Sequence, residues 1–216
     1  MPRFPSAKAR APQLLERLGE LYPHATCSLD WRNPYELLIA TMLSAQCTDE
    51  RVNQITPALF ERFPDAAAAA AVEPAEVEPY VKSAGFFRNK AKNIVASSRL
   101  LLERHGGEVP RTMEELLELP GVARKTASVV LAWCFGIQAG VTVDTHVSRL
   151  AQRLRLSRRS EPRQIEPDLM KLVPQADWQN LSIRLIFHGR AVCTARSPKC
   201  TSCPIADLCP SHTPKG

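Results

Sequence analysis

The sequence predicts an all-α protein. Nearly every segment with periodic apolar residues has the three- and four-residue spacing of a helix, and a sustained strand alternation is missing apart from the short Val141 and Val143 pair. Residues 66–71 are six consecutive alanines, and alanine is the strongest helix former. These observations favour helices along the whole 216-residue chain.

The first expected helices lie in the N-terminal third of the chain. Four leucines at helical spacing predict a helix over residues 11–21. Residues 36–46 are apolar nearly all round, which is typical of a central, buried helix, and Gln46 is the polar residue at its end. The alanine run 66–71 follows Asp65, a good N-cap residue, and forms the next helix.

Two further helices are predicted on either side of a tight turn. Thr112 and Glu115 have the spacing of a capping box and begin a helix that Pro120 and Gly121 end. The helix after the turn extends to about Phe135. A helix–turn–helix unit therefore lies near the middle of the chain.

Charge and composition limit the possible classes of protein. The net charge is +6, and the surplus lies at the chain ends: residues 27–138 hold 12 basic and 14 acidic side chains, whereas residues 139–216 hold 12 and 6. A basic surface of this kind suits a polyanion such as nucleic acid, although an inert basic surface has the same composition. An eighteen-residue apolar run and the apolar core of a signal peptide are both missing from the sequence, so we expect a cytoplasmic protein without membrane contact.

Four of the seven cysteines form a group with the spacing C-x6-C-x2-C-x5-C: Cys193, Cys200, Cys203 and Cys209. A chain without secretion signals is an unusual place for disulfides, so this spacing indicates a metal site. Four thiolates suit a tetrahedral zinc ion or a [4Fe–4S] cluster equally well. His188 and His212 lie close by in sequence, but four cysteines complete the ligand set, so both histidines are interpreted as bystanders.

The turn in Leu-Pro-Gly-Val-Ala-Arg-Lys-Thr-Ala, residues 119–127, has the features of a phosphate-binding hairpin. Gly121 can adopt the positive φ that a tight turn needs, and Pro120 fixes the approach. The next helix begins with unpaired N–H groups and a positive dipole end, which bind phosphate without base specificity. An ordinary corner between two helices is the alternative.

Lys125 and Asp144 are the candidates for chemistry. Lys125 lies in the first turn of the helix, where the dipole, the neighbouring Arg124 and partial burial would favour a neutral, nucleophilic amine. A phosphate-contacting lysine is the simpler interpretation of the local sequence. Asp144 precedes a periodic helix and is a good N-cap, a role that is compatible with a catalytic one.

Taken together, these motifs resemble those of the endonuclease III family of base-excision DNA glycosylases. The resemblance extends from about Leu14 to Cys209, and the order and spacing of the motifs make it specific. The matching segments are Pro-Tyr-Glu-Leu-Leu-Ile-Ala (34–40), Leu-Ser-Ala-Gln-Cys-Thr-Asp (43–49), the hairpin (119–127), Val-Asp-Thr-His (143–146) and the cysteine spacing.

The resemblance implies two helical domains with a DNA groove between them. One is a six-helix barrel over residues 27–137 that carries the helix-hairpin-helix. The other joins residues 1–26 to residues 138–216 and carries a [4Fe–4S] cluster held by the four cysteines. Both basic ends of the chain then fall in the cluster domain. We expect a monomer, associated with the nucleoid if the source is a bacterium.

The implied activity is that of a bifunctional DNA glycosylase and AP lyase of base excision repair. Its substrate is double-stranded DNA with oxidised pyrimidines or abasic sites, and the damaged nucleotide is flipped out of the helix. Lys125 attacks C1′ of the sugar to form a Schiff base, and β-elimination then cuts the strand. Asp144 matches the family's catalytic carboxylate, which helps to activate the nucleophile and stabilises charge developing on the sugar.

The resemblance also implies a set of DNA-binding residues. Gln46 matches the residue that fills the space left by the flipped nucleotide. Phe86 falls where the family places an intercalating wedge, and Phe87 follows it. The hairpin contributes the backbone contacts of Gly121, Ala123 and Arg124.

Two positions depart from the family pattern. Ala123 stands where a second hairpin glycine is usual, and Phe86 is larger than the usual aliphatic wedge. A related glycosylase with another base preference and a catalytically silent DNA-damage-binding module are the alternatives. The monofunctional relatives generally lack a lysine at the position of Lys125.

Overall fold

The computed structural model describes residues 4–213, and every regular element in this range is helical, as predicted. The chain divides into two compact units. Residues 27–139 form the central unit, and residues 4–26 together with residues 140–213 form the terminal unit. None of the helices within residues 4–213 combines the length and the apolar character needed to cross a membrane.

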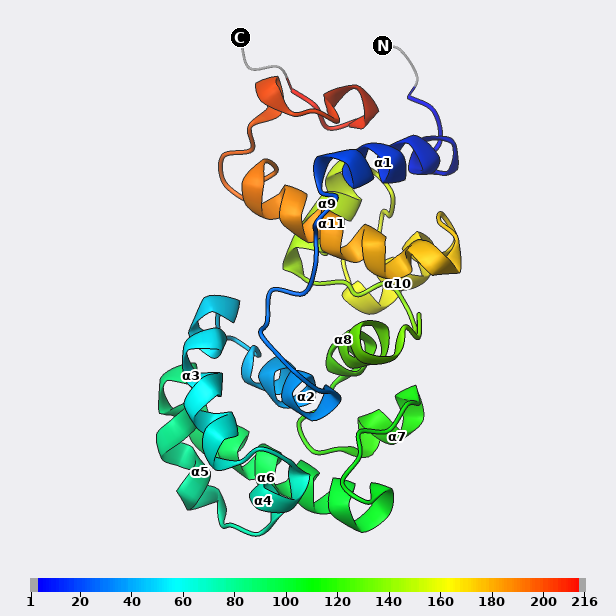
Figure 1. Cartoon of the computed structure of the whole chain (residues 1–216). Helices are drawn as coiled ribbons and strands as arrows, with labels where there is room; N and C mark the ends of the chain where they lie inside the picture. Colours follow the sequence, from blue (N-terminus) through cyan, green and yellow to red (C-terminus); the bar gives the residue numbers. More distant parts are fainter. Residues whose placement is uncertain (1–3, 214–216) are drawn as a thin grey trace. The chain divides into compact units, whose positions relative to one another are not determined.

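The central unit is built around one buried helix (Figure 1). In α2 every residue after Pro34 is buried, and this helix packs against α3, α6 and α8. The longest helix, α6, supports α4 and α5 along its length. The helices of this unit are α2 (Pro34–Leu43), α3 (Asp49–Arg62), α4 (Ala66–Ala70), α5 (Pro74–Val81), α6 (Phe87–His105), α7 (Met113–Glu118) and α8 (Arg124–Phe135), with the 3-10 turn η1 (Lys82–Ala84) before α6.

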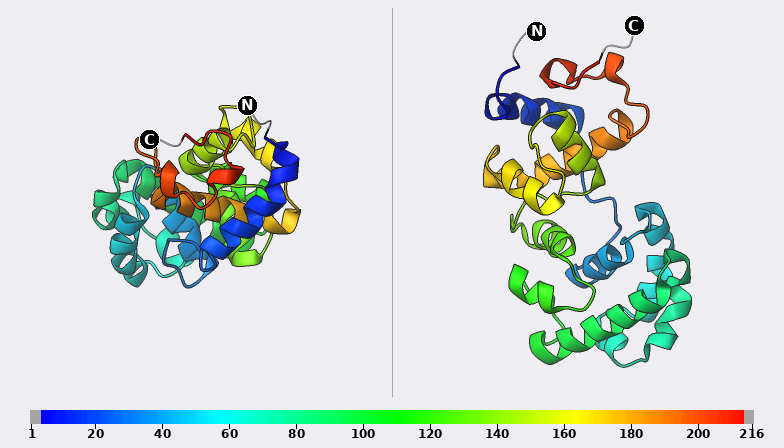
Figure 2. Two further views of the ribbon diagram at one scale, coloured as in Figure 1. Left: turned by 90° about the horizontal axis from the view of Figure 1, so that it is seen from above. Right: turned by 180° about the vertical axis from the view of Figure 1, so that it is seen from behind.

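The terminal unit combines the two ends of the chain. The first helix, α1, and the long C-terminal helix α11 lie side by side in the views of Figures 1 and 2. The α-helices are α1 (Ala7–Leu21), α9 (Thr145–Arg153), α10 (Pro162–Met170) and α11 (Trp178–Ala191), and the 3-10 turns are η2 (Gln175–Asp177), η3 (Cys200–Ser202) and η4 (Ala206–Leu208).

Arg10 joins the N-terminal helix to the C-terminal loop. Its side chain is 4% exposed, and its guanidinium donates to the carbonyl oxygens of Leu208 at 2.7 Å and Leu154 at 2.9 Å. Leu14 and Leu18, one and two turns further along α1, are buried in the same core. The N-terminal helix therefore completes a domain that is otherwise formed by the C-terminal third of the chain.

Several predicted helix starts are confirmed by their capping hydrogen bonds. The Asp65 side chain accepts from the Ala68 amide at 2.8 Å, and the Thr112 hydroxyl accepts from the Glu115 amide at 3.3 Å. The first helix begins earlier than predicted, at Ala7, because the Ser6 side chain caps it. The predicted end of the central helix at residue 46 is wrong, since α2 ends at Leu43.

Candidate active site and metal centre

The predicted hairpin joins α7 to α8, and its turn is fixed by contacts with α6. Gly121 has a φ of 82°, and a Cβ added to it would lie 2.6 Å from Nδ2 of Asn93 on α6. Ser97, one turn further along α6, donates its hydroxyl to the Pro120 carbonyl at 2.7 Å. Glycine is therefore required at residue 121 both for its backbone conformation and for the close approach of α6.

The start of α8 faces solvent. Ala123, Arg124 and Lys125 are all exposed, whereas Thr126 and Ala127 are buried. The partial burial expected for Lys125 is therefore wrong: the amphipathic helix directs the residues before Thr126 outward. An exposed lysine beside the first N–H groups of a helix is accessible to a ligand as large as a nucleic acid strand.

Ala123 is the N-cap residue of α8 and has an ordinary extended backbone, with φ −94° and ψ 166°. Any L-residue adopts this conformation, so the turn does not need glycine at this position. The Cβ of Ala123 stands at the N-terminus of α8, next to its first turn. The departure from the family pattern therefore adds a methyl group at the start of α8 and leaves the path of the chain unchanged.

Asp144 caps α9 in the terminal unit, as predicted. Its Oδ1 accepts from the Val147 amide at 2.8 Å, and its side chain is half-buried. A carboxylate at this position also interacts favourably with the positive end of the helix dipole. Since one oxygen accepts the capping bond, the second carboxylate oxygen is available for another partner.

Gln46, Phe86 and Gly121 lie around one small cavity in the central unit. The cavity measures about 170 Å³, and its lining residues are Met42, Ala45, Gln46, Phe86, Lys90, Asn93 and Gly121. Gln46 and Phe86 both have left-handed backbones, with φ 55° and 47°, and the Phe86 side chain is 65% exposed. Three of the predicted DNA-binding residues are thus brought together by the fold.

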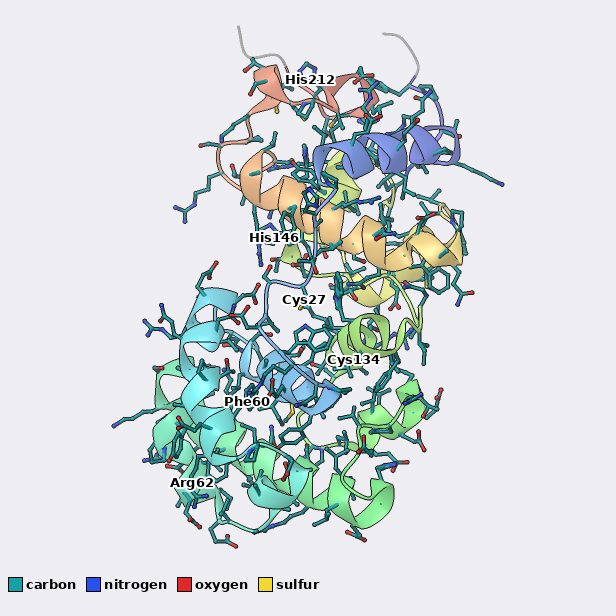
Figure 3. The ribbon with its side chains drawn as sticks, in the orientation of Figure 1. Cys27, Phe60, Arg62, Cys134, His146 and His212 are labelled. Carbon is teal, nitrogen blue, oxygen red and sulfur yellow. The ribbon has the colours of Figure 1, made fainter. Side chains whose placement is uncertain are left out.

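Phe87 differs from its neighbour Phe86. It is the first residue of α6, is half-buried against the core, and has the Arg88 guanidinium 5.4 Å from its ring centre. Figure 3 labels further side chains of the central unit. Phe60 of α3 is buried in the core, Cys134 of α8 is partly buried, and Arg62 of α3 is exposed. The role of Phe87 in DNA binding stays a prediction.

Sequence reasoning missed Lys90, which the fold buries in the wall of this cavity. A signal for it existed. Lys90 precedes Ile94, Ser97 and Leu101 at helical spacing, so a lysine stands on the face of α6 that packs inward.

The four predicted metal-binding cysteines line a single cavity of about 220 Å³ in the terminal unit. Burial raises the pKa of the Cys203 and Cys209 thiols, and a bound metal reverses this effect by holding the thiolates. A cavity of this size lined by four thiols fits a polynuclear iron–sulfur cluster.

Two arginines of α9 hold the loop that begins at Cys193. Arg149 donates through Nε to the Cys193 carbonyl at 3.1 Å. Arg153 donates through Nη1 to the Cys193 sulfur at 3.2 Å and to the Thr194 carbonyl at 2.8 Å. His146, at the start of α9, lies 3.0 Å from Arg149 Nη2 through its Nδ1 (Figure 3). The helix capped by Asp144 therefore also supports the cysteine loop.

His188 contacts one of the predicted metal-binding cysteines, a contact that the sequence did not predict. Its side chain is 1% exposed, with Nε2 3.6 Å from the Cys203 sulfur and Nδ1 2.9 Å from the Tyr22 hydroxyl. Burial lowers the pKa of His188 to about 4, so the neutral ring can donate one N–H to sulfur. His212 lines the same cavity (Figure 3). Neither histidine is needed as a fifth ligand.

Comparison with known proteins gives matches over most of the chain. Residues 39–175 match the family model described as HhH-GPD superfamily base excision DNA repair protein, and residues 193–209 match the iron-sulfur binding domain of endonuclease III. Endonuclease III from Synechocystis sp. is 62% identical over 97% of this chain and 95% of that protein. Endonuclease III from Escherichia coli is 43% identical over 94% of this chain and 95% of that protein.

Solved structures agree with these relatives. A non-covalent endonuclease III–DNA complex superposes with a TM-score of 0.90 at 44% identity, covering 95% of this chain and 96% of the other. A trapped endonuclease III–DNA covalent intermediate gives 0.89 at 43% identity with the same coverage. A thermostable thymine-DNA glycosylase shares the fold at 21% identity, with a TM-score of 0.85 over 96% of this chain and 99% of the other.

Proposed function

Because this chain belongs to the endonuclease III family, within the HhH-GPD superfamily of base excision DNA repair proteins, we propose that it removes oxidised pyrimidines from duplex DNA. It is a bifunctional DNA glycosylase and AP lyase, and it carries a [4Fe–4S] cluster. The observation that carries the residue assignments is the exposed lysine in the first turn of α8, directly after a phosphate-binding hairpin. The enzyme acts as a monomer in the cytoplasm.

Lys125 is the proposed nucleophile. Its neutral amine forms a bond to C1′ of the damaged nucleotide, and the glycosidic bond breaks, so that the base leaves with the bonding electron pair and takes up a proton. Ring opening gives a Schiff base between Lys125 and the sugar. Loss of a proton from C2′ then expels the 3′ phosphate, which cuts the strand by β-elimination.

Asp144 is the proposed carboxylate partner in this chemistry. Its Oδ1 accepts the capping bond from the Val147 amide, which fixes the side-chain rotamer. The second oxygen can accept a proton released in the reaction or stabilise positive charge that develops on the sugar. The capping bond thus orients a group whose chemical role needs the free oxygen.

The hairpin and the cavity beside it form the proposed DNA contact of the central unit. Gly121, Ala123 and Arg124 present backbone N–H groups and a positive charge to a phosphate. Gln46 and Phe86 fill the duplex where the nucleotide has left. Phe86 is larger than the aliphatic wedge of the family, which favours a shifted lesion or opposite-base preference within the same chemistry.

The cysteines Cys193, Cys200, Cys203 and Cys209 are the proposed ligands of the cluster. When bound, the cluster supplies four iron–thiolate bonds that cross-link the loop from residue 193 to residue 209. The arginine contacts from α9 order one end of this loop. The ordered loop adds its basic residues to the DNA-binding surface.

Borohydride trapping tests the proposed function. Reduction of the Schiff base in the presence of duplex DNA containing thymine glycol is expected to yield a covalent protein–DNA complex. The complex should be lost in Lys125→Ala and retained in Lys92→Ala, which removes an exposed lysine of α6. A catalytically silent damage-binding module would bind the duplex without trapping, and a wild-type protein that gives no trapped complex would refute the lyase function.

A further inference from the structure

Lys90 is a buried cation, and both hydrogen bonds of its ammonium group go to main-chain oxygens. Its side chain is 7% exposed, and Nζ donates to the Leu43 carbonyl at 2.8 Å and to the Ala84 carbonyl at 2.8 Å. Burial lowers the pKa of Lys90. Two carbonyl acceptors bind the protonated ammonium best, so this lysine serves as a donor rather than as a second nucleophile.

The two acceptors lie at the ends of two helical segments. Leu43 is the last residue of α2, and Ala84 is the last residue of η1. Carbonyl groups at a helix C-terminus have no partner within the helix, and a cation is favourable there. One ammonium group therefore caps two helical ends that are 41 residues apart in the sequence.

Both helical ends lead directly into the segments that carry the proposed DNA-probing residues. Gln46 follows Leu43 by three residues, and Phe86 follows Ala84 by two. Within residues 4–213, the non-glycine residues with positive φ are Gln46, Phe86 and Arg155. Such strained backbones persist only where the surrounding structure determines them, and Lys90 bonds to the segment in front of two of them.

The same face of α6 supports the hairpin. Asn93 packs under Gly121, and Ser97 donates to the Pro120 carbonyl. Lys90, Asn93 and Ser97 follow one another at helical spacing. The Gln46 segment, the Phe86 segment and the hairpin are thus all fixed to one rigid helix, and Lys90 provides the contact to the first two.

We propose that Lys90 is a positioning residue that joins the Gln46 and Phe86 segments, so that both side chains enter the duplex as one unit. This inference rests on the proposed DNA-probing role of those two residues. Without the ammonium, each segment keeps its own backbone but loses the shared donor, and the two probes must be ordered separately when DNA binds. The cost falls on extrusion of a stacked base, whereas an abasic site has no base to extrude.

The test compares two activities of three variants. Lys90→Met keeps the length and the apolar stem of the side chain but removes the donor, Lys90→Arg restores a cation with several donors, and Lys92→Met removes one exposed charge from the same helix. Glycosylase activity is measured on thymine-glycol duplex, and lyase activity on an abasic duplex. A 2-aminopurine next to the lesion reports unstacking by its fluorescence.

We expect Lys90→Met to lower glycosylase kcat/KM by about tenfold, to lower lyase activity by less than about threefold, and to slow the fluorescence rise. Lys90→Arg should recover glycosylase activity to within about threefold of wild type, and Lys92→Met should resemble wild type in both assays. An equal loss of both activities with an unchanged fluorescence rise would mean that Lys90 acts only on stability, and would overturn the proposal.

A second experiment uses the wild-type lysine and therefore holds even where Lys90→Met does not fold. A double-mutant cycle measures the loss of glycosylase activity in Gln46→Ala, in Phe86→Ala and in the double variant. If the two probes act as one unit, the fold-loss of the double variant is smaller than the product of the two single fold-losses by a factor of about three or more. Additive losses would refute the coupling. Failure of the proposed function would appear in wild-type trapping, whereas failure of this inference appears only in the variants.

Discussion

Replacing Asp144 by asparagine separates its structural role from its chemical one. Asparagine caps a helix as well as aspartate does, so Asp144→Asn should keep the 2.8 Å bond to the Val147 amide. The same substitution removes the carboxylate charge. Asp144→Ala removes both the cap and the charge, and the pair of variants distinguishes the two contributions.

The expected effect of these substitutions on stability is small, whereas their expected effect on the reaction rate is large. Loss of the cap in Asp144→Ala should lower the free energy of unfolding by about 1 kcal/mol, which corresponds to a Tm decrease of about 2–4 °C for a chain of this length. Asp144→Asn should stay within about 0.5 kcal/mol of wild type. Both variants should lose about 10²–10⁴-fold in the glycosylase step, the range for a positioned acid or base.

Single-turnover cleavage of thymine-glycol duplex and thermal unfolding measure the two quantities. Asp65→Ala is a matched control, because the Asp65 side chain caps α4 with a bond of the same length, 2.8 Å, but lies at neither the hairpin nor the cysteine cavity. It should lose stability while keeping its activity. A wild-type rate in Asp144→Asn would refute the catalytic role of the carboxylate, and an undiminished Tm in Asp144→Ala would refute the capping argument.

Two further predictions concern the hairpin. Gly121→Ala should lower the free energy of unfolding by about 1–3 kcal/mol and weaken DNA binding, because its Cβ would meet Asn93 at 2.6 Å and its φ is 82°. Gly106→Ala, with φ 61° and open space around its Cβ, is the control that should keep its DNA affinity, and equal losses of affinity would contradict the packing argument. Ala123→Gly should change stability by less than about 0.5 kcal/mol, since a better N-cap offsets the added chain entropy. It should bind duplex DNA several-fold more tightly in a salt titration, and unchanged affinity would show that the Ala123 methyl leaves the phosphate site free.

Local chemistry made much of the fold predictable. Asp65, Thr112 and Asp144 could be identified as N-caps because a capping bond joins residues only three apart. The cysteine spacing likewise indicated a metal site within a segment of 17 residues. The spacing did not distinguish a zinc ion from a [4Fe–4S] cluster, since both accept four thiolate ligands. The match to the iron–sulfur domain of endonuclease III decides between them.

Features set by distant contacts were not predictable. The Leu43 carbonyl at the end of α2 accepts from a donor 47 residues away, and the residues around Leu43 carry no sign of that contact. The exposure of Lys125 depends on which face of α8 packs on α2 and α7. The contact of His188 with Cys203 was missed because a complete ligand set says nothing about what surrounds it.

The bond from Arg10 to the Leu208 carbonyl has a consequence for how the protein is made. These residues are 198 positions apart, so at the usual rate of translation roughly 10–40 s separate their synthesis. For most of that interval Leu14 and Leu18 are uncovered, because the residues that share their core, from Val141 to Leu208, have not yet been translated. The helix that is translated first is therefore among the last to pack into its domain. A nascent chain released early lacks the terminal unit, although it contains α1.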